Sequence, residues 1–337
     1  MKIAIINDAD PRSGVGKYGY KLAEELSENF EETESDLIQK QYYQKPTYQA
    51  DSYIQGVKLP FLNRTVNDVL GLFSFSDRDR EDYDVVHFNT LKGVNPKEGD
   101  FVTVHDLMPI KIPENYSKYH RWRFKKNLEK TEGCNVICIS EETKKDFKEW
   151  KTFPVKNIFV IPNGVDTEVY RDRPKEESKE YFGLKEDKKY LLHVGSDEKR
   201  KNLPFLSDLL EKLPEEYTLI RIGPEVKELP KSKKRIIYLD DLTEKEMSKA
   251  YNASDYLLLP STYEGFGRPV IEALACKTQV IKSRKNLPNF ESAIELELEI
   301  ESWKETIISQ KEEKIAEFDH SWKSVVNRLK EVYSNEV

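Results

Sequence analysis

The sequence predicts an α/β protein of two domains, each a parallel sheet covered by helices. Short apolar runs recur as candidate strands in two successive series, and amphipathic stretches that fit helices lie between most of them. With 337 residues the chain is long for one domain and long enough for two, each able to bury its own core.

The candidate strands and helices follow one another along the chain. The first series of strands falls at 2–6, 84–88, 101–104, 136–139 and 158–161, and the second at 190–194, 218–222, 235–239, 256–260 and 279–281. Helices are expected at 15–29, 119–131, 141–150, 202–213 and 244–252, with a last helix at about 320–335. Turn residues and charges replace periodicity over 163–180, which we interpret as the interdomain linker, and the acidic residues around 291–301 are expected to form a solvated face.

Composition excludes several classes of protein. The net charge of −7 argues against a general nucleic-acid binder, which usually needs a strongly basic face. The three cysteines, Cys134, Cys138 and Cys276, lack paired metal-ligand spacing and are expected to be reduced thiols of a cytoplasmic protein. The chain opens on a strand rather than a signal peptide, and no run approaches the length of a membrane span.

Residues 264–272 read EGFGRPVIE and follow directly on the apolar run at 256–260. Crevices at the carboxyl ends of buried parallel strands are where ligands bind. Gly265 and Gly267 allow a tight turn, and the amides of 266–268 are expected near a helix N-terminus, where they can donate to phosphate oxygens. Glu264 on the loop and Glu272 in the first helical turn could both accept hydrogen bonds from the hydroxyls of one phosphorylated polyol. Taken singly, each of these residues is as often structural, because acidic residues favour the first turn of a helix and glycines punctuate turns.

With these glutamates the chain resembles the retaining nucleotide-sugar glycosyltransferases of family 4, which have the GT-B fold. The resemblance covers nearly the whole chain in the right order, through the segments 1–20 (MKIAIINDADPRSGVGKYGY), 102–106 (VTVHD), 137–147 (ICISEETKKDF), 158–166 (IFVIPNGVD), 190–203 (YLLHVGSDEKRKNL) and 318–333 (FDHSWKSVVNRLKEVY). It implies two Rossmann-like domains facing across a cleft. The first, 1–166, would bind the acceptor, the second, 167–319, the nucleotide sugar, and the C-terminal helix, 320–337, would cross back to the first.

The resemblance also implies roles for individual residues. Glu272 would bind the ribose of the donor, and Glu264 with the backbone of Gly265, Phe266 and Gly267 the donor sugar. Gly14 and Gly16 would bring backbone amides toward the donor.

Cationic and imidazole side chains complete the implied site. Arg200 and Lys201, after the turn at Gly195 and Ser196, would neutralise the diphosphate leaving group. Many family members carry the arginine where this chain has Ser196, so Lys201 is the safer assignment. A second departure is 277–286, where members often show a glycine-rich turn. His105 would contact the transferred sugar, although a lone histidine is usually structural.

The segment Gly14 to Gly19 also matches the G-x-G-x-x-G fingerprint of an NAD-dependent oxidoreductase. Seven residues separate it from the first strand, whereas the fingerprint needs its first glycine at the strand end. The candidate ribose ligand, Asp36, is not clearly at the end of a second strand. We therefore favour the transferase.

The implied reaction transfers mannose or glucose, from GDP-mannose or UDP-glucose, to a sugar, polysaccharide or lipid-linked acceptor with retention at the anomeric carbon. We expect no metal and no cofactor, since Asp-x-Asp triplets such as 8–10 and 77–79 arise easily in an acidic chain. The alternatives are a nucleotide-sugar epimerase or a catalytically silent sugar-nucleotide-binding protein, which would be expected to lose the cationic pair or a signature glutamate.

Residues 118–130 read KYHRWRFKKNLEK, a basic helix with aromatic residues. Such a helix can lie on an anionic membrane, which would make the protein peripheral at the inner face. Alternatively, Tyr119, Trp122 and Leu128 pack inward and the cations are solvated.

Overall fold

The computed structural model describes residues 1–7, 9, 13–28, 33–41, 52–55, 80–92, 94–224, 235–284, 288–316 and 320–336. The chain divides into two compact units. Unit 1 comprises Met1–Gly164 and Trp322–Val337, and unit 2 comprises Val165–Ser321. The sequence placed these boundaries after 166 and after 319.

Unit 1 is built on a sheet of seven parallel strands in the order β3-β2-β1-β4-β5-β6-β7. The strands are β1 (Lys2–Asn7), β2 (Glu34–Gln41), β3 (Ser52–Gln55), β4 (Val85–Phe88), β5 (Phe101–Val104), β6 (Asn135–Cys138) and β7 (Asn157–Val160). Its helices are α1 (Gly14–Glu28), α4 (Met108–Lys111), α5 (Lys118–Glu129), α6 (Glu141–Trp150) and α12 (Trp322–Glu336), with a short 3-10 helix, η1 (Pro113–Asn115). β1, β4, β5 and β6 are buried almost throughout, as expected of apolar runs in a sheet covered on both faces.

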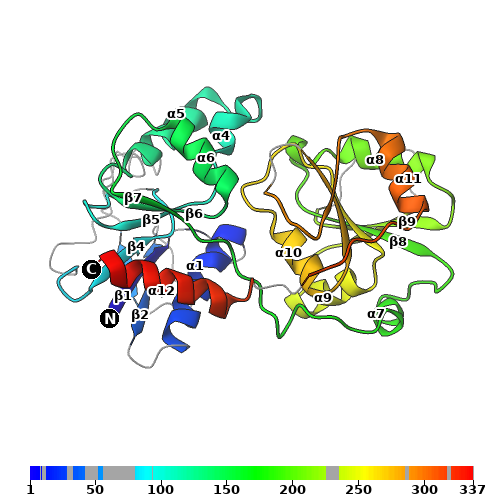
Figure 1. Cartoon of the computed structure of the whole chain (residues 1–337), viewed down its shortest axis with the longest axis horizontal. Coiled ribbons are helices and arrows are strands. Elements are labelled where there is room, and N and C mark those ends of the chain that lie inside the picture. The colour runs from blue at the N-terminus through cyan, green and yellow to red at the C-terminus, as the bar shows by residue number, and fades with distance from the viewer. Residues whose placement is uncertain are drawn as a thin grey trace. The chain divides into compact units, whose positions relative to one another are not determined.

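Unit 2 has six parallel strands in the order β10-β9-β8-β11-β12-β13. They are β8 (Lys189–Val194), β9 (Tyr217–Ile222), β10 (Ile236–Leu239), β11 (Tyr256–Leu259), β12 (Gln279–Ser283) and β13 (Ile294–Leu296). The helices are α7 (Lys175–Tyr181), η2 (Lys199–Lys201), α8 (Leu203–Lys212), α9 (Glu244–Asn252), α10 (Arg268–Ala275) and α11 (Ile300–Ile308). Figure 1 shows both sheets with helices on their two faces.

The C-terminal helix α12 completes the core of unit 1. Its buried face, which includes Val325, Leu329 and Tyr333, packs in one cluster with residues of β1 and α1. Figure 1 shows α12, drawn in red, beside the blue α1. A Cβ atom at Gly164 would lie 2.6 Å from the Trp322 ring, so only glycine lets the helix start so close to the chain that leaves unit 1.

All ten strands expected from apolar runs are present, but three others were missed. β3 and β13 lie at sheet edges and β2 next to one, where half-exposed positions tolerate polar residues. The stretch 291–301 is therefore not simply a solvated face: Ile294 is buried in β13, and Glu295 forms an ion pair with the buried Lys282.

The expected linker is also partly wrong, because α7 lies within it. This charged helix packs on α9 through polar contacts rather than an apolar stripe. The Tyr181 hydroxyl donates to Glu246 at 2.8 Å, and Lys249 Nζ lies 3.4 Å from the centre of the Tyr181 ring. Lys175 forms an ion pair with Asp255 at 2.7 Å. Apolar periodicity cannot detect a helix anchored in this way.

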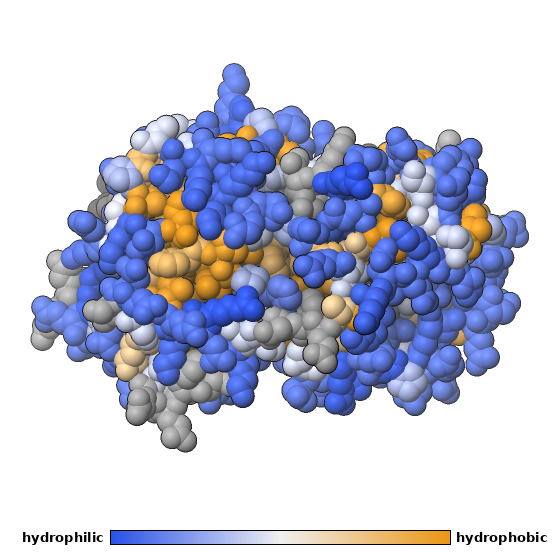
Figure 2. Space-filling view, in the orientation of Figure 1, coloured by the Kyte–Doolittle hydropathy of each residue, from blue (hydrophilic) through white to orange (hydrophobic). Residues whose placement is uncertain are grey.

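The surface is largely hydrophilic. Figure 2 shows hydrophilic residues over most of one face, as expected for a chain with 34% charged residues.

The three cysteines are not bonded to one another. Cys134, Cys138 and Cys276 are free and buried, and burial raises the pKa of each thiol to about 12, so they remain protonated and unreactive.

Candidate functional site

In unit 2 the candidate site lies at the carboxyl ends of two adjacent central strands, β8 and β11. The strand order reverses here, since β9 and β10 follow β8 on one side while β11 to β13 lie on the other. Such a switch point opens a crevice, because the loops leave the two strands in opposite directions. The loop after β8 carries Arg200 and Lys201, and the loop after β11 carries Glu264.

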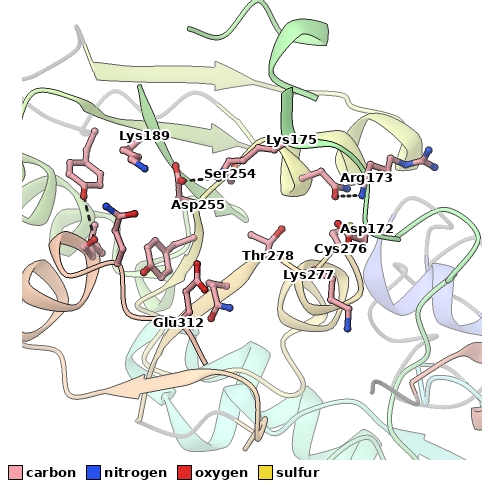
Figure 3. Close-up of a pocket in the computed structure, with 16 residues that line it drawn as sticks. Asp172, Arg173, Lys175, Lys189, Ser254, Asp255, Cys276, Lys277, Thr278 and Glu312 are labelled. Atoms are coloured by element: carbon pink, nitrogen blue, oxygen red, sulfur yellow. Dashed lines mark hydrogen bonds and ion pairs between the residues drawn. The ribbon is translucent and has the colours of Figure 1, made fainter. Parts of the chain in front are cut away.

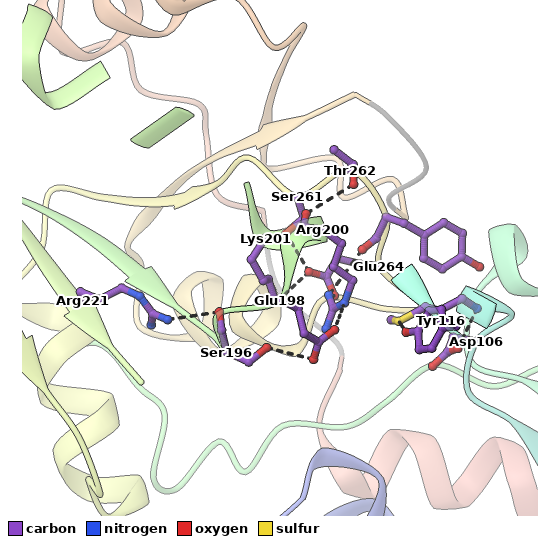
Figure 4. Close-up of polar contacts among 12 residues, drawn as sticks. Asp106, Tyr116, Ser196, Glu198, Arg200, Lys201, Arg221, Ser261, Thr262 and Glu264 are labelled. Atoms are coloured by element: carbon purple, nitrogen blue, oxygen red, sulfur yellow. Dashed lines mark hydrogen bonds and ion pairs between the residues drawn. The ribbon is translucent and has the colours of Figure 1, made fainter. Parts of the chain in front are cut away.

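Glu264 is held by three donors. Lys201 Nζ lies 2.6 Å from Glu264 Oε1, and the Ser261 hydroxyl donates to the same oxygen at 2.8 Å. Arg200 forms an ion pair with Glu264 Oε2 at 2.8 Å (Figure 4). The structure thus brings together three of the predicted catalytic residues in one buried cluster.

Most of the cluster is shielded from solvent. Glu264 is 7% exposed and Lys201 6%. Burial would raise the pKa of the Glu264 carboxyl, but the opposing charges of Lys201 and Arg200 outweigh it and hold that pKa below its ordinary value. The carboxylate is therefore ionised at neutral pH.

Local backbone conformations place the lysine. Lys201 ends η2, and the next residue, Asn202, adopts a left-handed conformation with φ of 52° before α8 begins. A Cβ atom at Gly195 would lie 2.9 Å from Lys201 Cε, so the glycine makes room for the lysine stem. Glu198 binds Arg200 Nε at 2.7 Å and accepts a hydrogen bond from the Ser196 hydroxyl at 3.0 Å, which ties Ser196 into the same network.

Glu272 lies one residue further along α10 than the sequence suggested, just past the first turn. It is the fifth residue of the helix, because α10 begins at Arg268 rather than at the proline. Its carboxylate accepts the Tyr251 hydroxyl at 2.7 Å and pairs with Arg268 at 3.3 Å. Gly267 caps the helix with φ of 90°, a conformation that favours glycine.

Two buried polar residues next to this site escaped the sequence reasoning. His193 on β8 and Arg221 on β9 are register partners, and both are 0% exposed. One guanidinium nitrogen of Arg221 donates to the Ser196 carbonyl at 3.2 Å. Burial lowers the pKa of His193 well below its ordinary value, so the ring is neutral. The sequence did contain a signal for them, because a histidine and an arginine interrupt runs of apolar residues that were predicted to be buried strands.

Three of the predicted residues, His105, Gly14 and Gly16, lie in unit 1, whereas Gly265 and Phe266 lie on the loop after β11 in unit 2. His105 directly follows β5, and its Nε2 lies 2.9 Å from Asn89 Oδ1 and 3.1 Å from the Asn89 carbonyl. Both are acceptors, so Nε2 carries the proton and Nδ1 is left as an acceptor. Burial lowers the pKa of His105 to about 4 although the Asn89 carbonyl opposes the shift. Gly14 opens α1 and is exposed, whereas Gly16 is buried and donates its amide to Ser13 Oγ at 3.0 Å.

A cavity of about 310 Å³ lies at the carboxyl ends of β4 and β5 in unit 1. We call it the unit 1 cavity. Val15 of α1, Asn89 after β4, His105 after β5 and several residues of α5 line it. It lies beside the point between β1 and β4 where the strand order reverses, and like the Glu264 cluster of unit 2 it lies at the carboxyl edge of its sheet.

A second cavity, of about 280 Å³, lies at the opposite edge of unit 2 (Figure 3). Lys189, Tyr217, Tyr256 and Gln279 line it, and they are the first residues of β8, β9, β11 and β12. It contains none of the predicted site residues and lies at the amino ends of the strands, so we do not regard it as the candidate site.

The fingerprint of a dinucleotide-binding loop does not fit. β1 ends at Asn7 and α1 begins at Gly14, so the glycines do not follow the strand directly. Asp36 is the third residue of the eight-residue β2, far from its carboxyl end, and accepts the Tyr83 hydroxyl at 2.6 Å.

The described residues hold no group of three or more His, Cys, Asp or Glu placed to bind a metal ion. The acidic residues of the two Asp-x-Asp triplets, at 8, 10, 77 and 79, lie outside the described part of the chain. None of the described helices is long and apolar enough to cross a membrane.

Two family models match consecutive segments of the chain. The model described as Glycosyltransferase Family 4 matches residues 12–169, and that described as Glycosyl transferases group 1 matches residues 174–297. The O-antigen chain mannosyltransferase RfbU of Salmonella typhimurium is 25% identical over 203 residues, which cover 57% of this chain and 54% of RfbU. The matched segments span 54%, 43% and 31% of the first three curated relatives.

Solved structures share the fold along the whole chain. Sucrose-phosphate synthase from Thermosynechococcus elongatus has a TM-score of 0.79 at 16% identity, covering 99% of this chain and 98% of that one. HepE from Anabaena, in complex with UDP and glucose, has a TM-score of 0.75 at 16% identity, covering 99% and 100%. The two family models match in their expected order over most of the chain and the fold is GT-B, so this chain belongs to the group 1 glycosyltransferases of family 4.

Proposed function

We propose that this chain transfers a hexose, mannose or glucose, from a nucleoside diphosphate sugar to a sugar, polysaccharide or lipid-linked acceptor. The observation that carries the proposal is the buried cluster of Glu264, Lys201 and Arg200 at the switch point of unit 2. A binding site for a diphosphate needs fixed positive charge in a water-poor crevice, and this cluster supplies it.

The cations of the cluster can contact a ligand while they hold Glu264. The Lys201 ammonium carries three donors, of which one contacts Glu264, and the Arg200 guanidinium carries five, which are shared among Glu264, Glu198 and the Tyr263 carbonyl. Three donors already hold Glu264, so its charge and position are fixed before any donor arrives. Catalysis then needs little reorganisation when negative charge grows on the leaving diphosphate.

In this proposal the loop after β8 and the loop after β11, with the helix that follows it, bind different parts of the donor. Lys201 and Arg200 neutralise the diphosphate, Glu264 and the backbone of 265–267 bind the donor sugar, and Glu272 binds the ribose. Phe266 is buried against Phe290, with ring centres 5.7 Å apart, which fixes the loop between Gly265 and Gly267.

Gly195 and Ser196 border the proposed donor site in unit 2. Within unit 1, His105 offers a neutral imidazole, and Gly14 and Gly16 lie at the start of α1. We propose that these three residues also serve the transfer reaction.

GDP-mannose and UDP-glucose are the proposed donors. RfbU is described as a mannosyltransferase, and HepE was solved with UDP-glucose. We propose retention without a metal or cofactor: the leaving phosphate takes the proton of the acceptor hydroxyl, which attacks the anomeric carbon from the same face. NMR of the product gives its anomeric configuration, and activity that vanishes with EDTA would contradict metal independence.

A cytoplasmic location, peripheral at the membrane, is proposed from α5. Tyr119 and Trp122 are 51% and 47% exposed and stack with ring centres 5.9 Å apart, so the expectation that they pack inward is wrong, while Leu128 is buried. Exposed aromatic rings beside Lys118 and Lys125 suit an anionic interface. Failure to float with anionic liposomes would contradict this.

The test of the proposed activity is a calorimetric panel of GDP, UDP, ADP and NAD. One nucleoside diphosphate should bind, and both Lys201→Ala and Glu272→Ala should weaken it. Lys199→Ala, an exposed lysine of the same 3-10 helix, is the matched control and should change little. Binding of NAD alone would overturn the proposal.

A further inference from the structure

The inward stripe of α5 is unusually polar for a helix that packs on a sheet. His120, Arg123, Phe124, Asn127 and Leu128 are spaced i, i+3, i+4, i+7 and i+8 and line the unit 1 cavity. In a surface helix this stripe is normally apolar. Three polar side chains have replaced apolar ones here, while Tyr119 and Trp122 face outward.

The cavity gathers positive charge. Arg123 and Lys92 both line it with His120, and both act to lower the pKa of that histidine, after burial as the largest cause. Asp106 is the acidic residue among the lining residues, and its Oδ1 accepts the Met108 amide at 2.9 Å. In the part of the chain that the structure describes, no carboxylate lies within ion-pair distance of Arg123.

Asn127 adds an independent indication of a ligand. The residue is 7% exposed, and its Oδ1 is buried with no hydrogen-bond partner among the described residues. A buried acceptor without a donor is costly, so such atoms usually meet a ligand or a water. Nδ1 of His105, in the same cavity, is a second acceptor, because Nε2 carries the proton.

Aromatic rings supply the remaining wall. Tyr116 and His120 lie with ring centres 5.1 Å apart, and Phe124 lines the same cavity. Acceptors suit hydroxyl groups, rings suit the apolar face of a sugar, and cations suit an anionic group.

The family resemblance already implies that the first domain binds the acceptor; we propose that this acceptor is a sugar or polyol carrying a phosphate and that it occupies the unit 1 cavity. Arg123, with His120 and Lys92, holds the phosphate, while Asn127 and His105 accept hydrogen bonds from hydroxyls. The assignment of the ligand as acceptor rests on the proposed transferase activity, but the binding itself does not.

The test follows the imidazole signal of His120 by NMR, assigned with His120→Gln, while glucose 6-phosphate or glucose is added. Glucose 6-phosphate should shift the signal and raise the pKa of His120, because a bound anion favours the charged ring. Glucose should bind at least tenfold more weakly. Arg123→Met should weaken glucose 6-phosphate binding roughly 10- to 100-fold, whereas Lys125→Met, an exposed cation of the same helix, should leave it within about twofold.

Two further experiments are needed. The first distinguishes a lipid headgroup from a free sugar phosphate, and the second distinguishes the unit 1 cavity from the nucleoside diphosphate site of unit 2. Vesicles of phosphatidylcholine with phosphatidylinositol, compared with phosphatidylcholine alone, test whether a lipid headgroup produces the same His120 shift. Nucleoside diphosphate binding to Arg123→Met should equal that of the wild type, so loss of one site is distinguishable from loss of the other. Equal binding of glucose and glucose 6-phosphate, or no effect of Arg123→Met, would overturn the inference.

Discussion

In unit 2 the Glu264 cluster contains a carboxylate that three donors already hold, whereas in unit 1 the unit 1 cavity contains an amide oxygen without a partner among the described residues. Both lie at the carboxyl edge of a parallel sheet. Topology therefore fixes where ligands can bind, and side-chain chemistry decides whether the empty site is internally paired or left unsatisfied.

The difference has an energetic meaning. A paired buried cluster costs little while it is intact and much when one member is removed. An unsatisfied buried acceptor costs stability in the empty protein and repays it on binding. The stability of unit 2 should therefore respond most to mutation of the cluster, and the stability of unit 1 should respond most to the binding of a ligand.

Removing one cation from unit 2 should give the largest effect. Lys201→Ala leaves Glu264 buried with one ion pair fewer, and the free energy of unfolding of unit 2 should fall by about 3 kcal/mol or more. Urea unfolding followed through Trp303, the tryptophan of unit 2, measures this loss. The exposed Lys199→Ala should change it by less than about 0.5 kcal/mol.

The second largest effect should be a difference between the two units in how much stability they lose at low pH. Burial lowers the pKa of His87 to about 3 and that of His105 to about 4, whereas unfolded histidine titrates near 6.5. Their stabilisation is complete above pH 6.5 and is lost as pH falls, by about 2 kcal/mol for each ring at pH 5.

Unit 1 contains two such rings and unit 2 one, His193. Hydrogen exchange of β4 and β5 should therefore accelerate more between pH 7.5 and pH 5, after correction for the intrinsic rates, than that of β8 and β9. His87→Gln should remove about half of the acceleration in unit 1 and so bring unit 1 close to the response of unit 2. An equal response of both units would show that the buried rings do not govern acid stability.

Removing the unpaired acceptor of Asn127 should give the smallest effect on stability, and this effect should be a gain rather than a loss. Asn127→Leu removes the unsatisfied oxygen with little change in volume and should stabilise unit 1 by about 1 kcal/mol. The same change should weaken glucose 6-phosphate binding, which NMR titration measures. If Asn127→Leu destabilises unit 1, a partner for Asn127 Oδ1 exists in the protein itself.

Sequence reasoning recovered the central strands because buried parallel strands are apolar along their length, as in β5 and β11. It placed Glu264 and Lys201 on the loops after β11 and β8, where the structure has them, because glycine turns and charge directly follow such strands. Their roles stay predictions. It missed β2 and β3, whose polar residues suit a sheet edge, and α7, which is anchored by charges. The polar residues of α5 can be read directly from the sequence. Which face of the helix turns inward depends on tertiary packing, which a local sequence pattern does not contain.

The way α12 completes unit 1 bears on how the chain is made. Unit 1 is encoded in two pieces, with unit 2 as an insertion between Gly164 and Trp322. On the ribosome, all strands of unit 2 have been synthesised before α12 emerges, and until then the residues of α1 that pack against α12 have no partner helix. The nascent chain therefore carries an incomplete core in unit 1, which includes Leu22 of α1, while unit 2 is being made, and this core marks where a chaperone would be needed.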